Sequence, residues 1–236
     1  MSDRPNRSCQ VRALGRVEYG KALALQRRLV EQRKQALIAD QLLLLEHPHT
    51  ITLGRNGRLE NLLASEPALL SAGISFHTSD RGGDITYHGP GQVVGYPIVD
   101  LRDWKRDVGA YVRAVEQVMI EALADFGIAA GRLPGCTGAW VNGRKIGAIG
   151  VHISRWITSH GFALNVNTDL SYFSYIVPCG LKGKGVTSLC RLTGKALDMH
   201  GVRQQVINAF ERVFHMRITA VTLARQEPVM PLMESI

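Results

Sequence analysis

Apolar positions along the chain follow a helical period in some stretches and a strand period in others. Residues 19–38 carry leucine and valine among charged side chains, at the three- and four-residue spacing of an amphipathic helix. The same spacing runs through residues 108–126 and stops at Gly127, a residue that commonly ends helices. Shorter helical patterns cover 66–72 and 202–214. The pattern therefore predicts four helices.

Short apolar or alternating runs between these helices predict strands. They cover residues 42–46, 50–53, 74–78, 93–99 and 161–166. Two further strands flank Asn142-Gly143, the preferred pair for a tight hairpin turn. Strands outnumber helices and a hairpin is present, so we expect an α+β fold whose mixed, largely antiparallel sheet is flanked by helices.

Length and composition indicate one folded unit. The chain has 236 residues, of which 45% are hydrophobic and 20% charged, and it contains no repeat or low-complexity linker. We predict a single domain over residues 1–236, with a core of about 17–220 and peripheral polar termini. The longest aliphatic run, residues 42–45, is too short to span a bilayer, and the first residues lack the apolar core of a secretory signal. The expected location is the cytoplasm.

The net positive charge says little about which molecules the protein binds. A net charge of +8 and a pI near 9.6 favour acidic partners in general. The basic residues are scattered and no RNA-binding signature is present, which argues against a nucleic-acid-binding protein. Four cysteines and eight histidines lack the spacing of zinc ligands, so we expect no metal.

A glycine-rich stretch, RGGDITYHGPGQ at residues 81–92, is the first candidate site. Four glycines in twelve residues let the backbone approach a ligand closely. The spacing matches neither a phosphate-binding loop nor a dinucleotide-binding loop. Composition alone favours a turn-rich connection between strands, although Arg81, Asp84 and His88 are unusual in a plain turn.

Two strand-like stretches could line a site. Lys145 follows the Asn142-Gly143 turn in GRKIGAIGV, residues 143–151, and periodicity leaves open whether it points to solvent or inward. An inward lysine would be desolvated, which lowers its pKa and suits it to act as a base. The other stretch is TSHGFALNV, residues 158–166, where small residues fit an apolar slot or an ordinary core strand equally well.

Cys179 is the strongest candidate for a nucleophile. It lies between Pro178 and Gly180, a setting typical of an exposed loop rather than of a buried structural cysteine. A thiol of ordinary pKa is only about 3% thiolate at pH 7. One nearby ammonium group can lower that pKa enough for catalysis, and Lys145 is a candidate for it. We expect the other three cysteines, at positions 9, 136 and 190, to be structural.

Together these stretches resemble the lipoyl(octanoyl) transferase family. The similarity covers roughly residues 40–190 and rests on five ordered matches: Glu46-His47-Pro48 with TLGR at 52–55, RGGDITYHGPGQ at 81–92, GRKIGAIGV at 143–151, TSHGFALNV at 158–166 and PCGLKGKGVTSL at 178–189. The resemblance implies the catalytic-domain fold of biotin and lipoate protein ligases. Position 152 is histidine, where related sequences often carry arginine or lysine.

The resemblance also implies the reaction. Cys179 would take an octanoyl group from the phosphopantetheine of acyl carrier protein, and Lys145 would lower the pKa of that cysteine. The acceptors would be lysines on lipoyl domains of 2-oxoacid dehydrogenase E2 subunits and on glycine-cleavage H protein. No ATP or metal is expected to be required, no nucleic acid or membrane to be bound, and a monomer is expected.

The resemblance further implies which residues line the acyl chain. These are Arg81, Gly82, Gly83, Asp84, Ile85, Thr86, Tyr87, His88, Ala148, Ile149, Gly150, Gly161, Phe162 and Ala163. Whether His152 or His160 contributes stays open. The alternative within this fold is an ATP-dependent lipoate or biotin protein ligase, which needs no nucleophilic cysteine.

Overall fold

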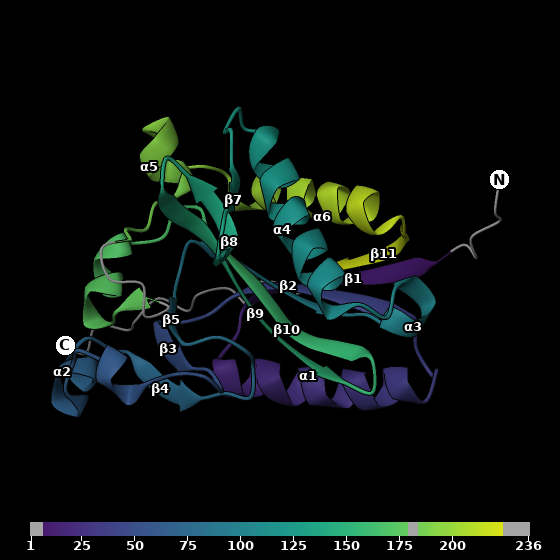
Figure 1. Ribbon diagram of the computed structural model, residues 1–236, viewed down its shortest axis with the longest axis horizontal. Coiled ribbons are helices and arrows are strands. Elements are labelled where there is room, and N and C mark those ends of the chain that lie inside the picture. The colour runs from purple at the N-terminus through teal and green to yellow at the C-terminus, as the bar shows by residue number, and fades with distance from the viewer. Residues whose placement is uncertain (1–6, 179–183, 224–236) are drawn as a thin grey trace, which may run out of the picture.

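The computed structural model describes residues 7–178 and 184–223, with side chains up to residue 219. An eight-stranded sheet forms its centre, in the order β11-β1-β2-β6-β10-β9-β8-β7 (Figure 1). The strands are β1 Ser8–Arg16, β2 Asp40–Glu46, β6 Gln92–Ile98, β7 Gly131–Leu133, β8 Cys136–Val141, β9 Arg144–Ser154, β10 Ile157–Asn165 and β11 Arg217–Leu223. Only the pairs β11–β1 and β1–β2 are parallel, so the sheet is mixed and largely antiparallel, as predicted.

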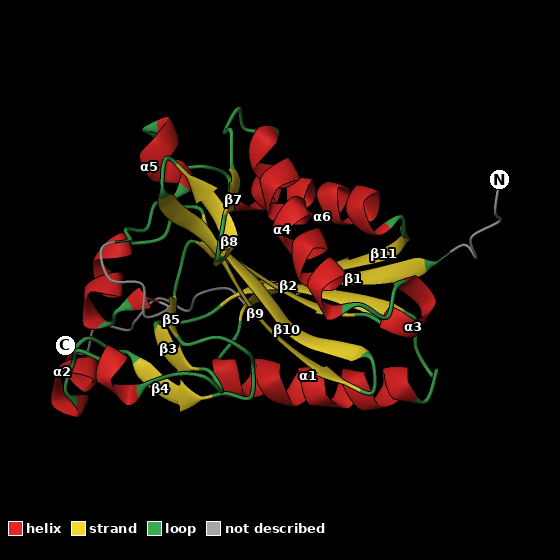
Figure 2. Ribbon diagram, viewed as in Figure 1, coloured by secondary structure: helices red, strands yellow, loops and turns green. Residues whose placement is uncertain are grey.

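A second, smaller sheet lies at one end of the first. Its order is β4-β3-β5, formed by Ser75–Thr78, Thr50–Leu53 and Ile85–His88. Apolar side chains of β3 and β5 pack there with those of the 3₁₀ helix η2 (Leu170–Tyr175) in a cluster that includes Ile51, Ile85 and Tyr87. The second sheet lies at the lower left of Figure 2, between α2 (Glu66–Ser71) and the start of α1 (Tyr19–Lys34), whose Tyr19 ring lies 5.2 Å from the His77 ring of β4.

Helices cover both faces of the main sheet (Figures 1 and 2). The elements are α1 Tyr19–Lys34, α2 Glu66–Ser71, α3 Leu101–Trp104, α4 Val108–Ala124, α5 Leu189–Thr193 and α6 Met199–Phe214, with the short 3₁₀ helix η1 Leu59–Asn61. Side chains of α4 and α6 form one core with one face of the sheet, and α1 packs on the other. The predicted helices and strands are therefore present, with small shifts in their bounds.

The prediction that the first residues are peripheral is wrong for residues 8–16. They form β1, which lies inside the sheet between β11 and β2, and its Cys9 and Val11 side chains are fully buried. Arg and Gln alternate with the apolar residues in SCQVRALGR, and this polar face hides the strand from a search for apolar runs. The sheet core thus begins about nine residues earlier than the predicted boundary near residue 17.

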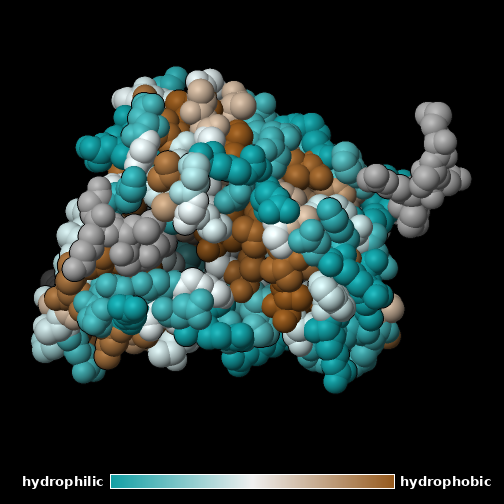
Figure 3. Space-filling view, in the orientation of Figure 1, coloured by the Kyte–Doolittle hydropathy of each residue, from teal (hydrophilic) through white to brown (hydrophobic). Residues whose placement is uncertain are grey.

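The strands β9 and β10 are longer than predicted and form one continuous hairpin. Their pairing extends from Leu164–Gly147 to Ile157–Ser154. The turn between them has positive φ at Arg155 (51°) and Trp156 (69°), values that the sequence pattern does not suggest for such bulky residues. In the space-filling view apolar surface gathers over this hairpin (Figure 3).

Among the described residues, no helix combines the length and the apolar character that crossing a bilayer requires.

We predict that β1 is essential to stability. Val11→Asp would put an uncompensated carboxylate into the core and should lower the free energy of unfolding by about 3–5 kcal/mol, measured by urea denaturation. Gln10→Asp is the matched control, because the Gln10 side chain is exposed on the same strand. This substitution should lower the free energy of unfolding by less than about 1 kcal/mol. Equal stabilities of the two variants would contradict the central position of β1.

Candidate active site

A cavity of about 210 Å³ opens between the β9–β10 hairpin and the segment from Arg81 to His88. It is lined by Tyr19, Arg81, Gly83, Asp84, Ile85, Thr86, His88, Tyr96, Gly135, Cys136, Thr137, Lys145, Ala148, Ile149, Gly150, His160, Gly161, Phe162 and Ala163. The structure thus brings together the three stretches that the sequence singled out, although they are up to 82 positions apart, from 81 to 163.

Small residues on the hairpin wall leave room for the cavity. In the register of β9 and β10, Gly150 pairs with Gly161 and Ala148 with Ala163. A Cβ atom on Gly150 would lie 2.8 Å from the carbonyl oxygen of Gly82, and one on Gly161 would lie 2.1 Å from that of Gly95. These glycines are therefore required by close approach of the neighbouring backbone. Larger residues here would push apart the two walls of the site.

Arg81 fastens the glycine-rich loop to the small sheet. Its guanidinium is buried and donates to the Thr52 carbonyl oxygen from Nη2 (2.7 Å) and to the Thr52 hydroxyl from Nε (3.2 Å). The next residue, Gly82, donates its backbone N–H to the Val151 carbonyl of β9 at 2.8 Å. The loop is thus anchored on both walls of the cavity. Gly82 itself does not line the cavity, contrary to the expectation for it.

Alternation along β5 divides its side chains between two environments. Thr86 and His88 line the cavity, whereas Tyr87 points into the small-sheet core. The Tyr87 hydroxyl lies 2.8 Å from His49 Nδ1, and its ring stacks on that of Tyr172. Tyr87 does not line the cavity, contrary to the expectation for it, because its side chain packs into the small-sheet core.

Lys145 takes the inward orientation that periodicity had left open. It is the second residue of β9, only 9% exposed, and it lines the cavity. Its Nζ lies 5.0 Å from the centroid of the Trp140 ring on β8. Its backbone N–H donates to Gly185 O and its carbonyl accepts from Thr187 N–H, both at 2.9 Å. These two bonds join the chain after position 184 directly to β9.

Cys179 lies outside the described residues. The described residues on either side of it lie near Lys145. A small cavity is lined by Pro178, Val186 and Lys145. Val186 also forms a parallel β-bridge with Lys145. Cys9 is buried in β1, in agreement with a structural role. Cys136, however, begins β8 and lines the larger cavity as a free thiol, so it belongs to the wall of the site rather than to the core.

Polar side chains that the sequence did not reveal close part of the cavity. Tyr96 donates its hydroxyl to His47 Nε2 (2.7 Å), while His47 Nδ1 donates to the Val17 carbonyl (2.6 Å). His160 also lines the cavity, and its Nε2 donates a hydrogen bond to Asp80 at 2.8 Å. Of the two histidines whose contribution the sequence leaves open, His160 is therefore the one that lines the cavity. Nothing local in the sequence marks Tyr96, since it lies in an apolar strand.

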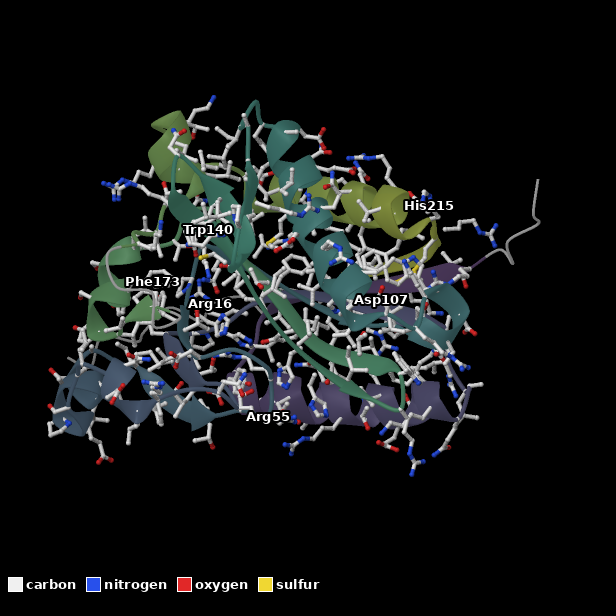
Figure 4. The ribbon with its side chains drawn as sticks, viewed as in Figure 1. Arg16, Arg55, Asp107, Trp140, Phe173 and His215 are labelled. Atoms are coloured by element: carbon white, nitrogen blue, oxygen red, sulfur yellow. The ribbon has the colours of Figure 1, made fainter. Side chains whose placement is uncertain are left out.

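His152 does not line the cavity. Its Nδ1 accepts a hydrogen bond from Arg55 Nη2 at 3.0 Å on the exposed end of β9. Arg55 is labelled in Figure 4, low on the molecule and apart from Trp140, which lies on the β8–β9 hairpin. The Arg55 guanidinium therefore lies next to the side chain at position 152.

Burial keeps the central histidines neutral. Desolvation lowers the pKa of His47 to about 4 and the pKa of His88 to about 3. His88 donates from Nδ1 to the Gln92 side-chain oxygen (2.8 Å), Gln92 Nε2 donates to Asn165 (2.9 Å), and Asn165 Nδ2 donates to the Thr187 carbonyl (3.0 Å). This relay fixes the neutral tautomer of His88 and ties the cavity wall to the chain beside Lys145.

The cavity suits an apolar, chain-like ligand next to an amine. Its hairpin wall is made of glycine, alanine, isoleucine and phenylalanine, and Lys145 lies in the same cavity. Within the described part of the chain, histidine, cysteine and acidic side chains form no group that could hold a metal ion.

Comparison with known proteins gives the family. Residues 18–211 match the family model of the lipoyl protein ligase A/B catalytic domain. An octanoyltransferase of Solibacter usitatus is 63% identical over 208 residues, which cover 88% of this chain and 94% of that protein. An octanoyltransferase of Flavobacterium johnsoniae is 44% identical over 230 residues, covering 90% and 99% of the two chains. The chain belongs to the octanoyltransferase family.

Solved structures of two protein ligases share the fold of this octanoyltransferase-family chain. Lipoate-protein ligase A bound with ATP superposes with a TM-score of 0.73 at 18% identity, over 92% of this chain and 90% of that one. The biotin protein ligase of Aquifex aeolicus in complex with biotin and ATP gives 0.53 at 16% identity, over 87% and 70%. The predicted ligase-like fold and the predicted acyltransferase class are thereby confirmed.

Neutral buried histidines make the stability of the octanoyltransferase-family fold dependent on pH. The unfolded chain takes up protons on both histidines below about pH 6.5, while the folded chain does so only near pH 4 and below. The free energy of unfolding should therefore fall as pH falls through this window, by roughly 1–2 kcal/mol for each histidine between pH 7 and 5.

Urea denaturation at several pH values of the wild type and of His88→Gln tests this dependence. The variant lacks one titrating group, so its stability should fall less steeply with decreasing pH. His200→Gln is the control, because His200 is exposed at the start of α6. If His88→Gln and His200→Gln keep the same slope as the wild type, His88 does not contribute to the pH dependence.

Proposed function

We propose that this enzyme transfers an octanoyl group from acyl carrier protein to a lysine of lipoyl domains through a thioester on Cys179. The observation that supports this most is Lys145, which lies in the apolar cavity while its backbone pairs with the chain that follows Cys179. An amine beside an apolar slot is the setting that a cysteine acyl-enzyme needs. The names of the relatives supply the octanoyl group.

The walls of the cavity favour a straight acyl chain over a polar substrate. An octanoyl group has seven apolar carbons beyond its carbonyl, and burying them is worth about 6 kcal/mol at roughly 0.8 kcal/mol per carbon. Ala148, Gly150, Gly161 and Ala163 leave the slot open along the hairpin, and Phe162 adds an aromatic surface. The acyl chain would lie against these residues.

The first half of the reaction forms the acyl-enzyme. The Cys179 thiolate attacks the carbonyl carbon of the thioester carried by phosphopantetheine, and the bond between that carbon and the pantetheine sulfur breaks. The departing thiolate takes a proton from the Lys145 ammonium and leaves as a thiol. One thioester replaces another, so the step needs no ATP and no metal.

The second half passes the acyl group to the acceptor. Only about one lysine in 2,500 is neutral at pH 7 when its pKa is near 10.4. Lys145, left neutral by the first half, takes a proton from the acceptor ammonium. The neutral amine then attacks the carbonyl carbon of the Cys179 thioester, and its nitrogen, positively charged in the tetrahedral intermediate, releases one proton to solvent. The bond between the carbonyl carbon and the Cys179 sulfur breaks, which leaves the amide, the Cys179 thiolate and the Lys145 ammonium.

The proposed partners fit the charge of the chain. Acyl carrier protein would be the donor, and lipoyl domains of 2-oxoacid dehydrogenase E2 subunits and glycine-cleavage H protein would be the acceptors. These domains are typically acidic, so a net charge of +8 would steer them to the enzyme. The second candidate in this fold, an ATP-dependent ligase, would activate a free acid instead and leave Cys179 without a role.

Cys179→Ser should abolish the acyl-enzyme. Incubated with octanoyl-acyl carrier protein in the absence of ATP, the wild type should gain one octanoyl adduct on Cys179, detected by intact-protein mass spectrometry and peptide mapping. Cys190→Ser should behave like the wild type, since Cys190 lies on α5 away from the cavity. An unchanged adduct in Cys179→Ser, or transfer that appears only with ATP, would overturn the proposed mechanism.

Lys145→Ala should slow alkylation of Cys179 by iodoacetamide at pH 7 by about ten- to hundredfold. The physical reason is the loss of an ammonium that stabilises the thiolate by one to two pKa units. Lys145→Arg should keep much of the alkylation rate but lose transfer to the acceptor, because a guanidinium holds its proton. Lys195→Ala, an exposed lysine, is the control. Equal alkylation rates in Lys145→Ala and Lys195→Ala would contradict the pairing.

A further inference from the structure

Trp140 and Lys145 form a cross-strand pair that the proposed reaction does not yet use. They are register partners on β8 and β9, so their side chains lie on the same face of the sheet. The Lys145 ammonium lies 5.0 Å from the centroid of the Trp140 ring, within the range of a cation–π interaction. Both side chains are nearly buried, at 4% and 9% exposure, and burial strengthens such a contact.

The Trp140 ring is fixed by its surroundings. Its Nε1–H donates to the Cys136 carbonyl at 2.9 Å, which sets the orientation of the indole plane. The strand bulges next to Trp140, and Gly138 adopts φ 127°, where a Cβ atom would lie 2.4 Å from Gly147 O and 3.6 Å from Lys145 Cε. A glycine at this point therefore lets the backbone of β9 approach β8 closely, and the lysine stem lies at ordinary contact distance from it.

A buried carboxylate holds the bulge in place. Glu116 of α4 accepts the Gly138 backbone N–H at 2.9 Å and binds Arg132 Nε at 2.8 Å through its other oxygen. The ring, the bulge and the helix thus form one rigid support under Lys145. Figure 4 shows Trp140 on the hairpin, above Phe173 of η2.

We propose that Trp140 is a positioning residue for the reaction, whose ring face holds Lys145 in its ammonium form and fixes the direction of its side chain. This inference rests on the proposed function and adds to it the group that orients the lysine. The negative face of an indole attracts an ammonium and gives a neutral amine little. The contact therefore favours the protonated lysine at the moment when the thiolate has to be stabilised.

Other titratable side chains also line the cavity that holds Lys145. Arg81 and Asp84 come from the loop before β5, His88 from β5, Cys136 from β8, and His160 from β10, while Tyr19 and Tyr96 line its polar side. Arg81 is bound to Thr52, Asp84 to the backbone of residues 58 and 85, and His160 to Asp80. Trp140 acts on Lys145 from the strand next to it.

The experiment is the pH profile of Cys179 alkylation, followed by peptide-resolved mass spectrometry so that other thiols do not contribute. Trp140→Leu removes the ring face and should raise the midpoint pH of alkylation by about half a unit to one unit, equivalent to a three- to tenfold slower reaction at pH 7. Trp140→Phe keeps a ring face and should shift the midpoint less. Thermal unfolding of both variants establishes that they fold.

A series of fluorinated tryptophans at position 140 tests the electrostatic part without changing the shape of the side chain. Fluorine withdraws electron density from the ring face, so the midpoint should rise steadily with the number of fluorines. If Trp140→Leu does not fold, this series still tests whether the ring face affects the midpoint pH of Cys179 alkylation. A midpoint that does not move across the series would overturn the proposal.

The Lys145→Ala background separates this inference from the proposed function. Trp140→Leu should add no further shift there, because the ring acts only through the lysine. An equal shift with and without Lys145 would mean a merely structural role for Trp140 and would overturn the inference. Failure of the wild type to form an adduct on Cys179 would instead remove the proposed function itself.

Discussion

One short stretch of backbone pairing supports the rest of the site: the two hydrogen bonds that join Lys145 to residues 185 and 187. They attach the segment that follows the predicted nucleophile to the edge of β9. Because β9 also pairs with β8 and β10, the same strand carries the lysine, the partner of Trp140 and one wall of the cavity. A loop that holds a nucleophile needs such an anchor, since a misplacement of about 1 Å can cost two orders of magnitude in rate.

The cavity itself follows from close backbone approach. Glycines at positions 150 and 161 let the Arg81 loop and β6 come within contact distance of the hairpin, which leaves a narrow slot instead of a packed core. Arg81 satisfies its buried charge on Thr52, and the histidines of the polar side stay neutral through desolvation. A charged ligand group would be costly to bury against the apolar hairpin wall unless it found a partner there.

Much of this arrangement could be predicted from the sequence because it depends on local patterns. Asn142-Gly143 predicts the β8–β9 turn, whereas the small residues of 158–166 fit either an apolar slot or an ordinary core strand. Tyr96 and Cys136 were missed as lining residues because their position depends on pairing between distant strands, which no local period encodes. The sequence pattern does not predict β1, because arginine and glutamine alternate with its two fully buried residues and no apolar run results. The resemblance places Tyr87 in the cavity wall because a motif gives the residue type but not the side of the strand that the residue faces.

The central claim is that the acyl group passes through Cys179 on its way to the acceptor. The most direct measurement is a single-turnover chase: the octanoyl-enzyme is isolated, mixed with a lipoyl domain without ATP, and quenched at successive times for mass spectrometry of both proteins. The octanoyl group should leave Cys179 and appear on one lysine of the lipoyl domain with the same rate constant, at least as fast as steady-state turnover. An adduct that stays on Cys179 while the lipoyl domain is modified from added donor would contradict it.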